Sequence, residues 1–155
     1  MMFDAKLDMD PIGEMLRVRG LHDGGRVQQV IDSECMRLMG PYMPRRQAGE
    51  LEHMMVMATI VGSGQIDTPG PYAHYLHEGI VYVDPKYHCA GFQSTKAESY
   101  GEWFSRRNVV KVPTDRELQY TGAPMRGKKW FDRMKGDHKD EILEAAQRAA
   151  DGGKV

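Results

Sequence analysis

The stretch from Thr68 to Val83 reads T-P-G-P-Y-A-H-Y-L-H-E-G-I-V-Y-V and decides how the elements around it are arranged. Pro69 and Pro71 interrupt any preceding strand, because proline lacks the N–H group that a strand donates. Pro71 also suits the first turn of a short helix, and Gly79 suits the left-handed residue that ends one. Ile80 to Val83 are β-branched and aromatic residues typical of a strand. The stretch therefore predicts a strand, a turn, a short helix and a second strand.

Two helices are expected on the N-terminal side. Asp10-Pro11 is typical of a helix start, and Gly20 is expected to end this first short helix. Asp23 is expected to cap a second helix, which Gly40-Pro41 stops. The apolar residues of the second helix recur at helical spacings: Val27, Val30, Ile31, Cys35 and Leu38.

Several strands are expected between and beside these helices. Residues 3–7 predict a short edge strand. Met54 to Val61 is an apolar run that predicts a strand buried on both faces, or buried on one face and docked to a partner on the other. Gly62-Ser63-Gly64 predicts a hairpin turn leading to a weaker strand at Gln65 to Thr68.

The C-terminal half begins with a long polar loop, Asp84 to Arg107, which neighbouring proteins are expected to order. Two short strands, Val109 to Val112 and Glu117 to Tyr120, follow on either side of Pro113. A long helix is expected from Met125 to Ala150. It carries an apolar stripe at spacings of three and four residues: Phe131, Met134, His138, Ile142, Ala145 and Ala149.

These elements predict an α+β fold in a single domain spanning residues 1–155. It consists of a small, mainly antiparallel sheet with an N-terminal helix pair, a short central helix and a long C-terminal helix. A net charge of -1 excludes a global basic field that would attract nucleic acid. No apolar run is long enough to span a membrane, and the chain start lacks a signal-peptide layout. Cys35 and Cys89 form no motif, which favours a reducing compartment.

Catalytic motifs are missing from the sequence. It contains no G-x-G-x-x-G, no complete G-x-x-x-x-G-K-S/T and no G-x-S-x-G. We therefore expect neither an enzyme nor a cofactor. The alternative is a metal-dependent hydrolase or nuclease using His74, His77 and Glu78, but the histidines are three residues apart, unlike the H-E-x-x-H pattern. His88-Cys89 lacks an orienting partner for a thiol–imidazole pair.

A basic cluster precedes and opens the long helix. Arg126, Lys128 and Lys129 are candidate DNA-facing residues, and Arg133 and Lys135 follow them. Cations at a helix N-terminus oppose its dipole, so either the helix begins later than Met125 or these charges bind a partner. A DNA-binding module is the second alternative function. The cluster could equally be a solvent-exposed charged surface that binds no partner. A second basic cluster consists of Arg106, Arg107 and Lys111.

Aromatic residues supply the candidate assembly contacts. Tyr72, Tyr75 and Leu76 share one side of the short central helix, and Trp103 and Phe104 anchor the long loop. The same side of the central helix would equally suit packing onto the sheet. His138 falls on the apolar stripe and is expected to be a hydrogen-bonded core histidine.

Four segments resemble the minor capsid proteins of tailed phages that infect Gram-positive bacteria. They are R-G-L-H-D-G-G-R-V-Q-Q-V-I-D-S-E from Arg19, P-Y-A-H-Y-L-H-E-G from Pro71, S-R-R-N-V-V-K-V-P-T-D-R-E-L-Q-Y from Ser105 and G-K-K-W-F-D-R-M-K-G-D-H-K-D-E-I-L from Gly127. More distantly, the family is similar to phage neck or tail-completion proteins. Those relatives carry Thr-Gly-x-Leu before the first long strand, whereas residues 47–51 keep the glycine and leucine without the threonine.

The resemblance implies a non-enzymatic structural protein of the virion, made in the bacterial host cytoplasm and located at the head–tail junction. It would form a homo-oligomeric ring that contacts the portal or adaptor proteins of the head and the tail-terminator proteins, with channel DNA as a further candidate contact. No catalytic, cofactor or metal residues come with this family, and no membrane partner is expected. A third alternative is a scaffold or chaperone that is absent from the finished particle.

Overall fold

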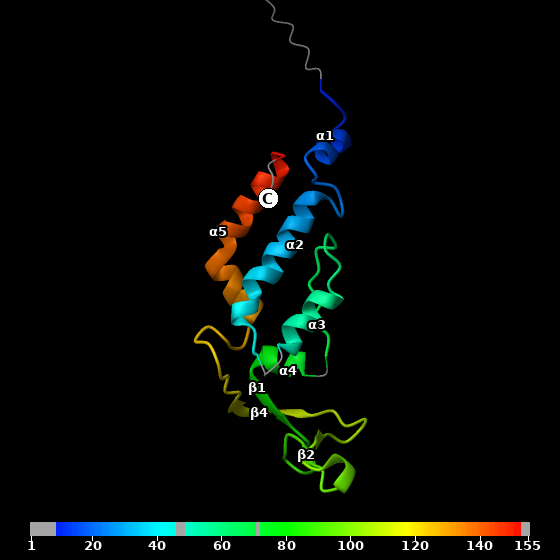
Figure 1. Cartoon of the computed structure of the whole chain (residues 1–155), viewed down its shortest axis with the longest axis vertical. Coiled ribbons are helices and arrows are strands. Elements are labelled where there is room, and N and C mark those ends of the chain that lie inside the picture. Colours follow the sequence, from blue (N-terminus) through cyan, green and yellow to red (C-terminus); the bar gives the residue numbers. More distant parts are fainter. Residues whose placement is uncertain (1–8, 46–48, 71, 153–155) are drawn as a thin grey trace, which may run out of the picture.

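The computed structural model describes residues 9–45, 49–70 and 72–152, and the expected strand at residues 3–7 lies outside them. Five α-helices and two small antiparallel sheets are distributed along one long axis in this part of the chain (Figure 1). This is the α+β class expected from the sequence. No helix among the described residues combines the length and apolar character needed to cross a membrane.

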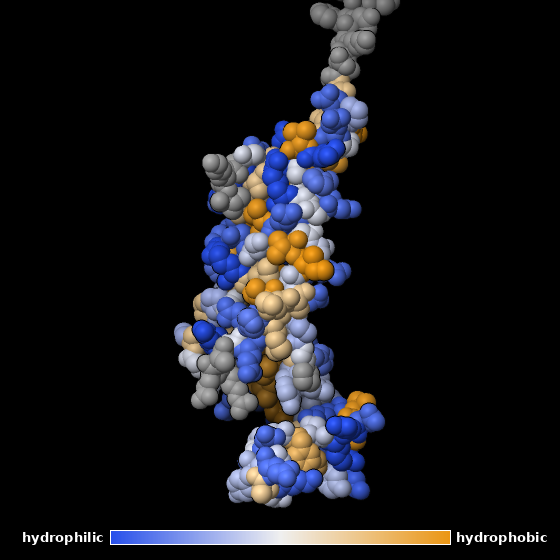
Figure 2. All heavy atoms as spheres, turned by 45° about the vertical axis from the view of Figure 1, so that its right-hand side comes forward, coloured by the Kyte–Doolittle hydropathy of each residue, from blue (hydrophilic) through white to orange (hydrophobic). Residues whose placement is uncertain are grey.

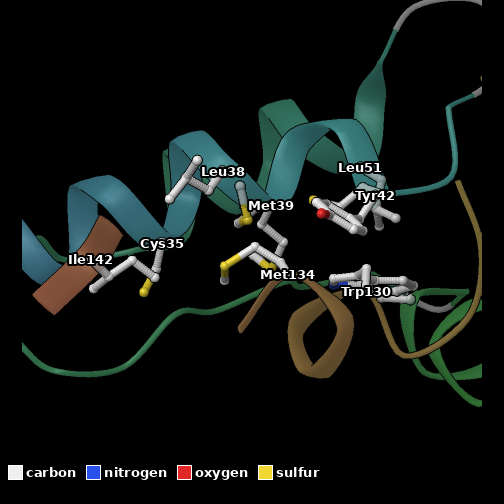
Figure 3. Packing of buried hydrophobic residues seen from close by; sticks show 11 residues of the cluster. Cys35, Leu38, Met39, Tyr42, Leu51, Trp130, Met134 and Ile142 are labelled. Carbon is white, nitrogen blue, oxygen red and sulfur yellow. The ribbon is translucent and has the colours of Figure 1, made fainter. Parts of the chain in front are cut away.

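Helices α2 (Arg26–Met39) and α5 (Trp130–Ala150) form the central pair, lying side by side and running in opposite directions (Figure 1). A short 3-10 turn, Gly40–Tyr42, continues α2. Between the helices lies the main core, and Met39 and Met134 are completely or almost completely buried in it (Figure 3). Flexible methionine side chains fill irregular space well, which is one use for the twelve methionines of this chain.

Helix α3 (Glu50–Ala58) replaces the strand expected at Met54 to Val61, and that prediction was wrong. An apolar run does not by itself distinguish a strand from a buried helix segment. Leu51 and Met55 lie one turn apart and are buried against the core, while methionine, leucine, glutamate and alanine all favour helix. The turn around Gly62 is present, but Gln65 to Thr68 is irregular, so the expected hairpin was also wrong.

The predicted unit at Thr68 to Val83 is confirmed in its helix and its second strand. Helix α4 (Ala73–Glu78) ends at Gly79, which has a positive φ of 75°, and β1 (Ile80–Val83) follows at once. At the N-terminus, α1 (Ile12–Val18) and α2 are confirmed as helices. However, no side chain caps either of them: their N-caps are Pro11 and Gly25 instead of the expected Asp10 and Asp23.

Strand β4 (Val112–Glu117) pairs antiparallel with β1 in a two-stranded sheet with an irregular register. The two strands expected at Val109 to Val112 and Glu117 to Tyr120 were therefore wrong: the single strand spans the residues between them, contains Pro113 and shares only Val112 and Glu117 with the expected ranges. Both strands of such a sheet are edge strands, and an edge can accept a residue that donates no hydrogen bond.

The segment between β1 and β4 was expected to be a long loop, but it has secondary structure of its own. Strand β2 (Phe92–Gln93) pairs antiparallel with β3 (Trp103–Phe104), and a 3-10 turn, Ala97–Ser99, lies between them. We call residues 84–111 the arm. It forms the end of the molecule opposite α1 (Figure 1).

Helix α5 begins at Trp130, five residues later than expected. Lys129 is its N-cap, so Arg126 and Lys128 precede the helix, which resolves the conflict with the helix dipole in favour of a later start. The expected apolar stripe was wrong at its first residue, Phe131. The buried residue at the start of α5 is Trp130, which is 3% exposed, whereas Phe131 is 37% exposed.

Candidate assembly interface

The three candidate residues of the central helix lie in three different environments. Tyr72 is 60% exposed just before α4 begins. Tyr75 is half-buried, and its ring lies 4.7 Å from the ring of Tyr82 on β1. Leu76 packs against the main core, and its carbonyl accepts a hydrogen bond from the Tyr120 hydroxyl. Only Tyr72 therefore offers most of its side chain to a partner.

A pair of substitutions separates the fold role of Tyr75 from a contact role of Tyr72. Tyr75→Ala is expected to lower the free energy of unfolding by about 1–3 kcal/mol, because it removes an aromatic pair and half-buried area. Tyr72→Ala should change it by less than about 0.5 kcal/mol, as substitutions at exposed positions do. Denaturant titration of both variants measures the difference. Equal effects at the two positions would contradict these placements.

The arm displays aromatic side chains around a small aromatic cluster. Phe92 stacks on Phe104 with ring centroids 5.6 Å apart, and Tyr87 meets Phe92 edge-on at 5.3 Å. Trp103 is 65% exposed on β3, and Tyr100 is more exposed still. Such large, exposed rings on a structured hairpin are the kind of residue that dominates protein–protein contacts.

An ion pair joins the two ends of the arm. Asp84 is buried, and its carboxylate accepts two hydrogen bonds from the Arg106 guanidinium, at 2.6 and 2.7 Å. The same carboxylate accepts from the backbone N–H groups of Lys86 and Tyr87. The Arg106 guanidinium, followed by those two N–H groups, holds the pKa of Asp84 well below its usual range. We call this contact the arm clamp.

Acid should weaken the arm clamp. A carboxylate with a depressed pKa in the folded state contributes stability that is fully present above its unfolded pKa of about 4 and declines progressively as the pH falls from that value through the folded pKa. We expect an acid-stable protease to cleave the arm much faster at about pH 3 than at about pH 5 in the wild type. Asp84→Asn should be cleaved rapidly at both pH values, because it lacks the charge. An unchanged cleavage pattern in that variant would contradict the clamp.

The structure exposes two further apolar surfaces. The sequence did not indicate the first, and it placed the second within Met54 to Val61, on an expected strand with one face open to a partner. The first is α1 with its flanking residues: Ile12, Met15, Leu16, Val18 and Leu21. No residue of α1 is buried. The second, which we call the α3 patch, comprises the end of α3 and the following turn: Val56, Met57, Ile60 and Val61. Figure 2 turns this side of the molecule forward and shows apolar residues gathered near α1 and again lower down, over the helical body.

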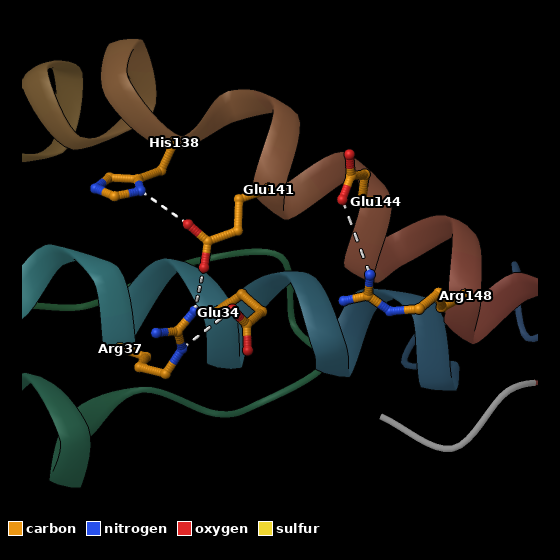
Figure 4. Close-up of polar contacts among 6 residues, drawn as sticks. All are labelled: Glu34, Arg37, His138, Glu141, Glu144 and Arg148. Atoms are coloured by element: carbon orange, nitrogen blue, oxygen red, sulfur yellow. Dashed lines mark hydrogen bonds and ion pairs between the residues drawn. The ribbon is translucent and has the colours of Figure 1, made fainter.

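The helix pair α2–α5 carries a charged network on its surface (Figure 4). The Arg37 guanidinium donates to Glu34 at 2.6 Å and to Glu141 at 2.7 Å. The other Glu141 oxygen lies 2.9 Å from Nδ1 of His138. Arg37 and, second, His138 lower the pKa of Glu141. His138 is hydrogen-bonded, as expected, but its partner is the carboxylate of Glu141 and its side chain is 30% exposed, so its expected place in the core was wrong.

The alternative metal residues do not form a metal-binding group. Nδ1 of His77 lies 3.5 Å from Glu78, whose carboxylate also accepts from Lys129 at 2.8 Å. The ring of His74 instead lies against Tyr75 and Tyr82. Within the described ranges, no three histidine, cysteine, aspartate or glutamate side chains are grouped so that they could hold a metal ion.

The candidate DNA-facing cations all have intramolecular acceptors. Arg126 donates to the Met43 carbonyl, Lys128 to Glu117 and Lys129 to Glu78. The glycine and lysine spacing from Gly122 to Lys128 matches the first part of a phosphate-binding loop, but Lys129 stands where that motif needs serine or threonine. Phosphate binding here would have to compete with these existing contacts.

Comparisons with protein families, curated proteins and solved structures find no match to this chain. The geometry therefore carries the functional argument. It offers exposed apolar and aromatic surfaces at α1, at the α3 patch and on the arm, and these suit contacts with other proteins better than chemistry on a small molecule.

Proposed function

We propose that this chain is a structural protein of the tailed-phage neck, which assembles as a ring and joins the head to the tail. It acts through contacts with other chains and has no catalytic role. Its partners are further copies of itself, portal or adaptor proteins on the head side and tail-terminator proteins on the tail side. The similarity of its sequence segments to phage minor capsid proteins supports the same assignment.

The observation that carries this proposal is the placement of the exposed apolar surfaces. Residues at α1 and on the arm lie at opposite ends of the long axis, and the α3 patch lies between them (Figures 1 and 2). Monomeric proteins rarely expose several large apolar surfaces, whereas a neck subunit needs contacts toward the head, the tail and its neighbours. This arrangement gives a ring subunit one surface for each of these three directions.

A nonsense mutation in the gene, tested in the host that propagates the phage, examines this proposal. Electron microscopy of the mutant lysate should show filled heads and complete tails that are not joined. Supplying the wild-type chain from a plasmid should restore joined particles. Joined, infectious particles in the absence of the chain would overturn the proposal, and a chain needed for assembly but absent from finished particles would indicate a scaffold or chaperone.

A further inference from the structure

The two faces of the β2–β3 hairpin differ in what they contact. Phe92 pairs with Phe104, and directly opposite residues of two paired strands point to the same face. This face has contacts within the arm, because the two phenylalanine rings stack and Tyr87 meets Phe92 edge-on. Successive residues of a strand point to opposite faces, so Trp103 lies on the other face, opposite Gln93. Its indole takes no part in the aromatic cluster and is 65% exposed.

The backbone of Gly91 lies close against the indole of Trp103. A β-carbon added at Gly91 would come within 3.1 Å of Cε3 and 3.6 Å of Cζ3 of that ring. It would also come within 3.1 Å of the carbonyl oxygen of Phe104 on the neighbouring strand. The benzene edge of the indole thus occupies the space that the side chain of any larger residue at this position would need.

The backbone conformation does not by itself require a glycine at position 91. Ten glycines among the described residues have a positive φ, and Gly91 is not one of them. A β-branched residue would even favour the strand that begins at Phe92. A glycine in or beside a strand often marks a close approach of another group. What Gly91 provides is therefore space, and the side chain that uses this space is Trp103.

Contact with Gly91 limits the motion of the Trp103 ring while leaving most of that ring exposed. A side chain that is held in one conformation before binding loses less conformational entropy on binding than a freely rotating one. Strand β2 thus orients both large rings of β3, Phe104 by stacking of Phe92 and Trp103 by the bare backbone of Gly91. Both rings are presented to a partner in a preformed arrangement.

We propose that Gly91 is a positioning residue, which holds the indole of Trp103 in one conformation as an anchor of the arm's contact with a head or tail protein. The inference rests on the proposed function, since it names a residue that makes this contact and the residue that orients it. The partner that fits is a protein surface with an apolar slot for the exposed part of the indole.

Nuclear magnetic resonance of the isolated chain tests the positioning. In the wild type we expect a nuclear Overhauser contact between the α-protons of Gly91 and Hε3 of Trp103, and an indole N–H as rigid in ¹⁵N relaxation as that of buried Trp130. Gly91→Val should make the Trp103 indole clearly more mobile while the ring contacts between β2 and β3 persist. Gly91→Ala should show a smaller change in the same direction. Gly136→Val, at a glycine with open space around it, should leave this indole unchanged.

Complementation in the phage host tests the anchor with the same variants. Trp103→Ala should lower the yield of joined particles by about tenfold or more, because aromatic anchors carry much of an interface's affinity. Gly91→Val should also lower the yield, although it leaves the indole in place. Gly136→Val should join heads to tails like the wild type.

Several results would overturn this proposal. They are a wild-type chain without the Gly91–Trp103 contact or with a mobile Trp103 indole, an indole that stays equally rigid in Gly91→Val, and normal joining by Trp103→Ala or by Gly91→Val. If Gly91→Val lost the ring contacts between β2 and β3, Gly91→Ala would decide in its place, and an unchanged indole there would overturn the positioning. Joined, infectious particles without the chain would overturn the proposed function alone, since the resonance measurements do not depend on the particle.

Discussion

Replacing Trp130 with alanine is expected to lower the free energy of unfolding by about 3–5 kcal/mol, the usual cost of deleting a buried aromatic side chain. Trp130 begins α5 and belongs to the main core. Its ring makes a T-shaped contact with the ring of His77 on α4, with the centroids 4.7 Å apart, and so links the two helices. Its removal leaves a cavity where these two helices meet. Denaturant unfolding followed by circular dichroism measures this loss.

The neighbouring residue provides the control. Phe131 is 37% exposed, so Phe131→Ala should cost less than about 1 kcal/mol. Substitutions at these two adjacent aromatic residues are thus expected to give very different losses, mainly because one side chain is buried and the other is partly exposed. A larger loss at Phe131 than at Trp130 would mean that α5 is rotated relative to its position in this structure.

The double substitution Trp103→Ala and Phe104→Ala on the arm is expected to abolish head–tail joining. Aromatic anchors of an interface typically contribute about 2 kcal/mol or more each, so losing two would weaken the arm's contact by roughly a thousandfold. The fold should survive, because both side chains are more than half exposed, although Phe104 also stacks on Phe92. Thermal unfolding of the purified variant and a complementation assay measure the two effects separately.

Two controls make this result interpretable. Val110→Ala removes another exposed apolar side chain from the arm, but a small one, and should leave joining intact. His74→Ala should also leave infectivity nearly intact, as should His77→Ala. Normal joining by the double variant would exclude the arm's aromatic face as a contact. Loss of infectivity in a folded histidine variant would revive the metal alternative.

Local signals were sufficient for some elements of the fold. Helix α4 and strand β1 could be predicted because Gly79 separates a helical pattern from a β-branched run within a few residues. Helix α2 was equally predictable from its apolar spacing. The overall α+β class followed from such local elements, without any knowledge of how they pack.

Other features depend on contacts between residues that are distant in the chain. Met54 to Met57 is apolar all round, and the packing of Leu51 and Met55 in the main core decides which face of α3 is buried. The arm clamp joins Asp84 to Arg106, 22 residues apart, and no local pattern signals it. The choice between an assembly contact and internal packing for Leu76 stayed open for the same reason, because the core that Leu76 packs against comes from other elements.

The candidate site could be predicted only in part. Trp103 and Phe104 were recognised because large rings in a polar segment are unusual, and the structure places both at the surface. The exposed face of α1 was missed because Ile12, Met15 and Leu16 have the spacing of an ordinary core-facing helix. A sequence pattern identifies an apolar face but does not say whether the same chain or another one covers it.

Image reconstruction of the intact particle tests the central claim most directly. We expect a ring of copies of this chain at the head–tail junction, with the arm in contact with a different protein. A complete, infectious particle whose junction contains no copy of the chain would contradict the account.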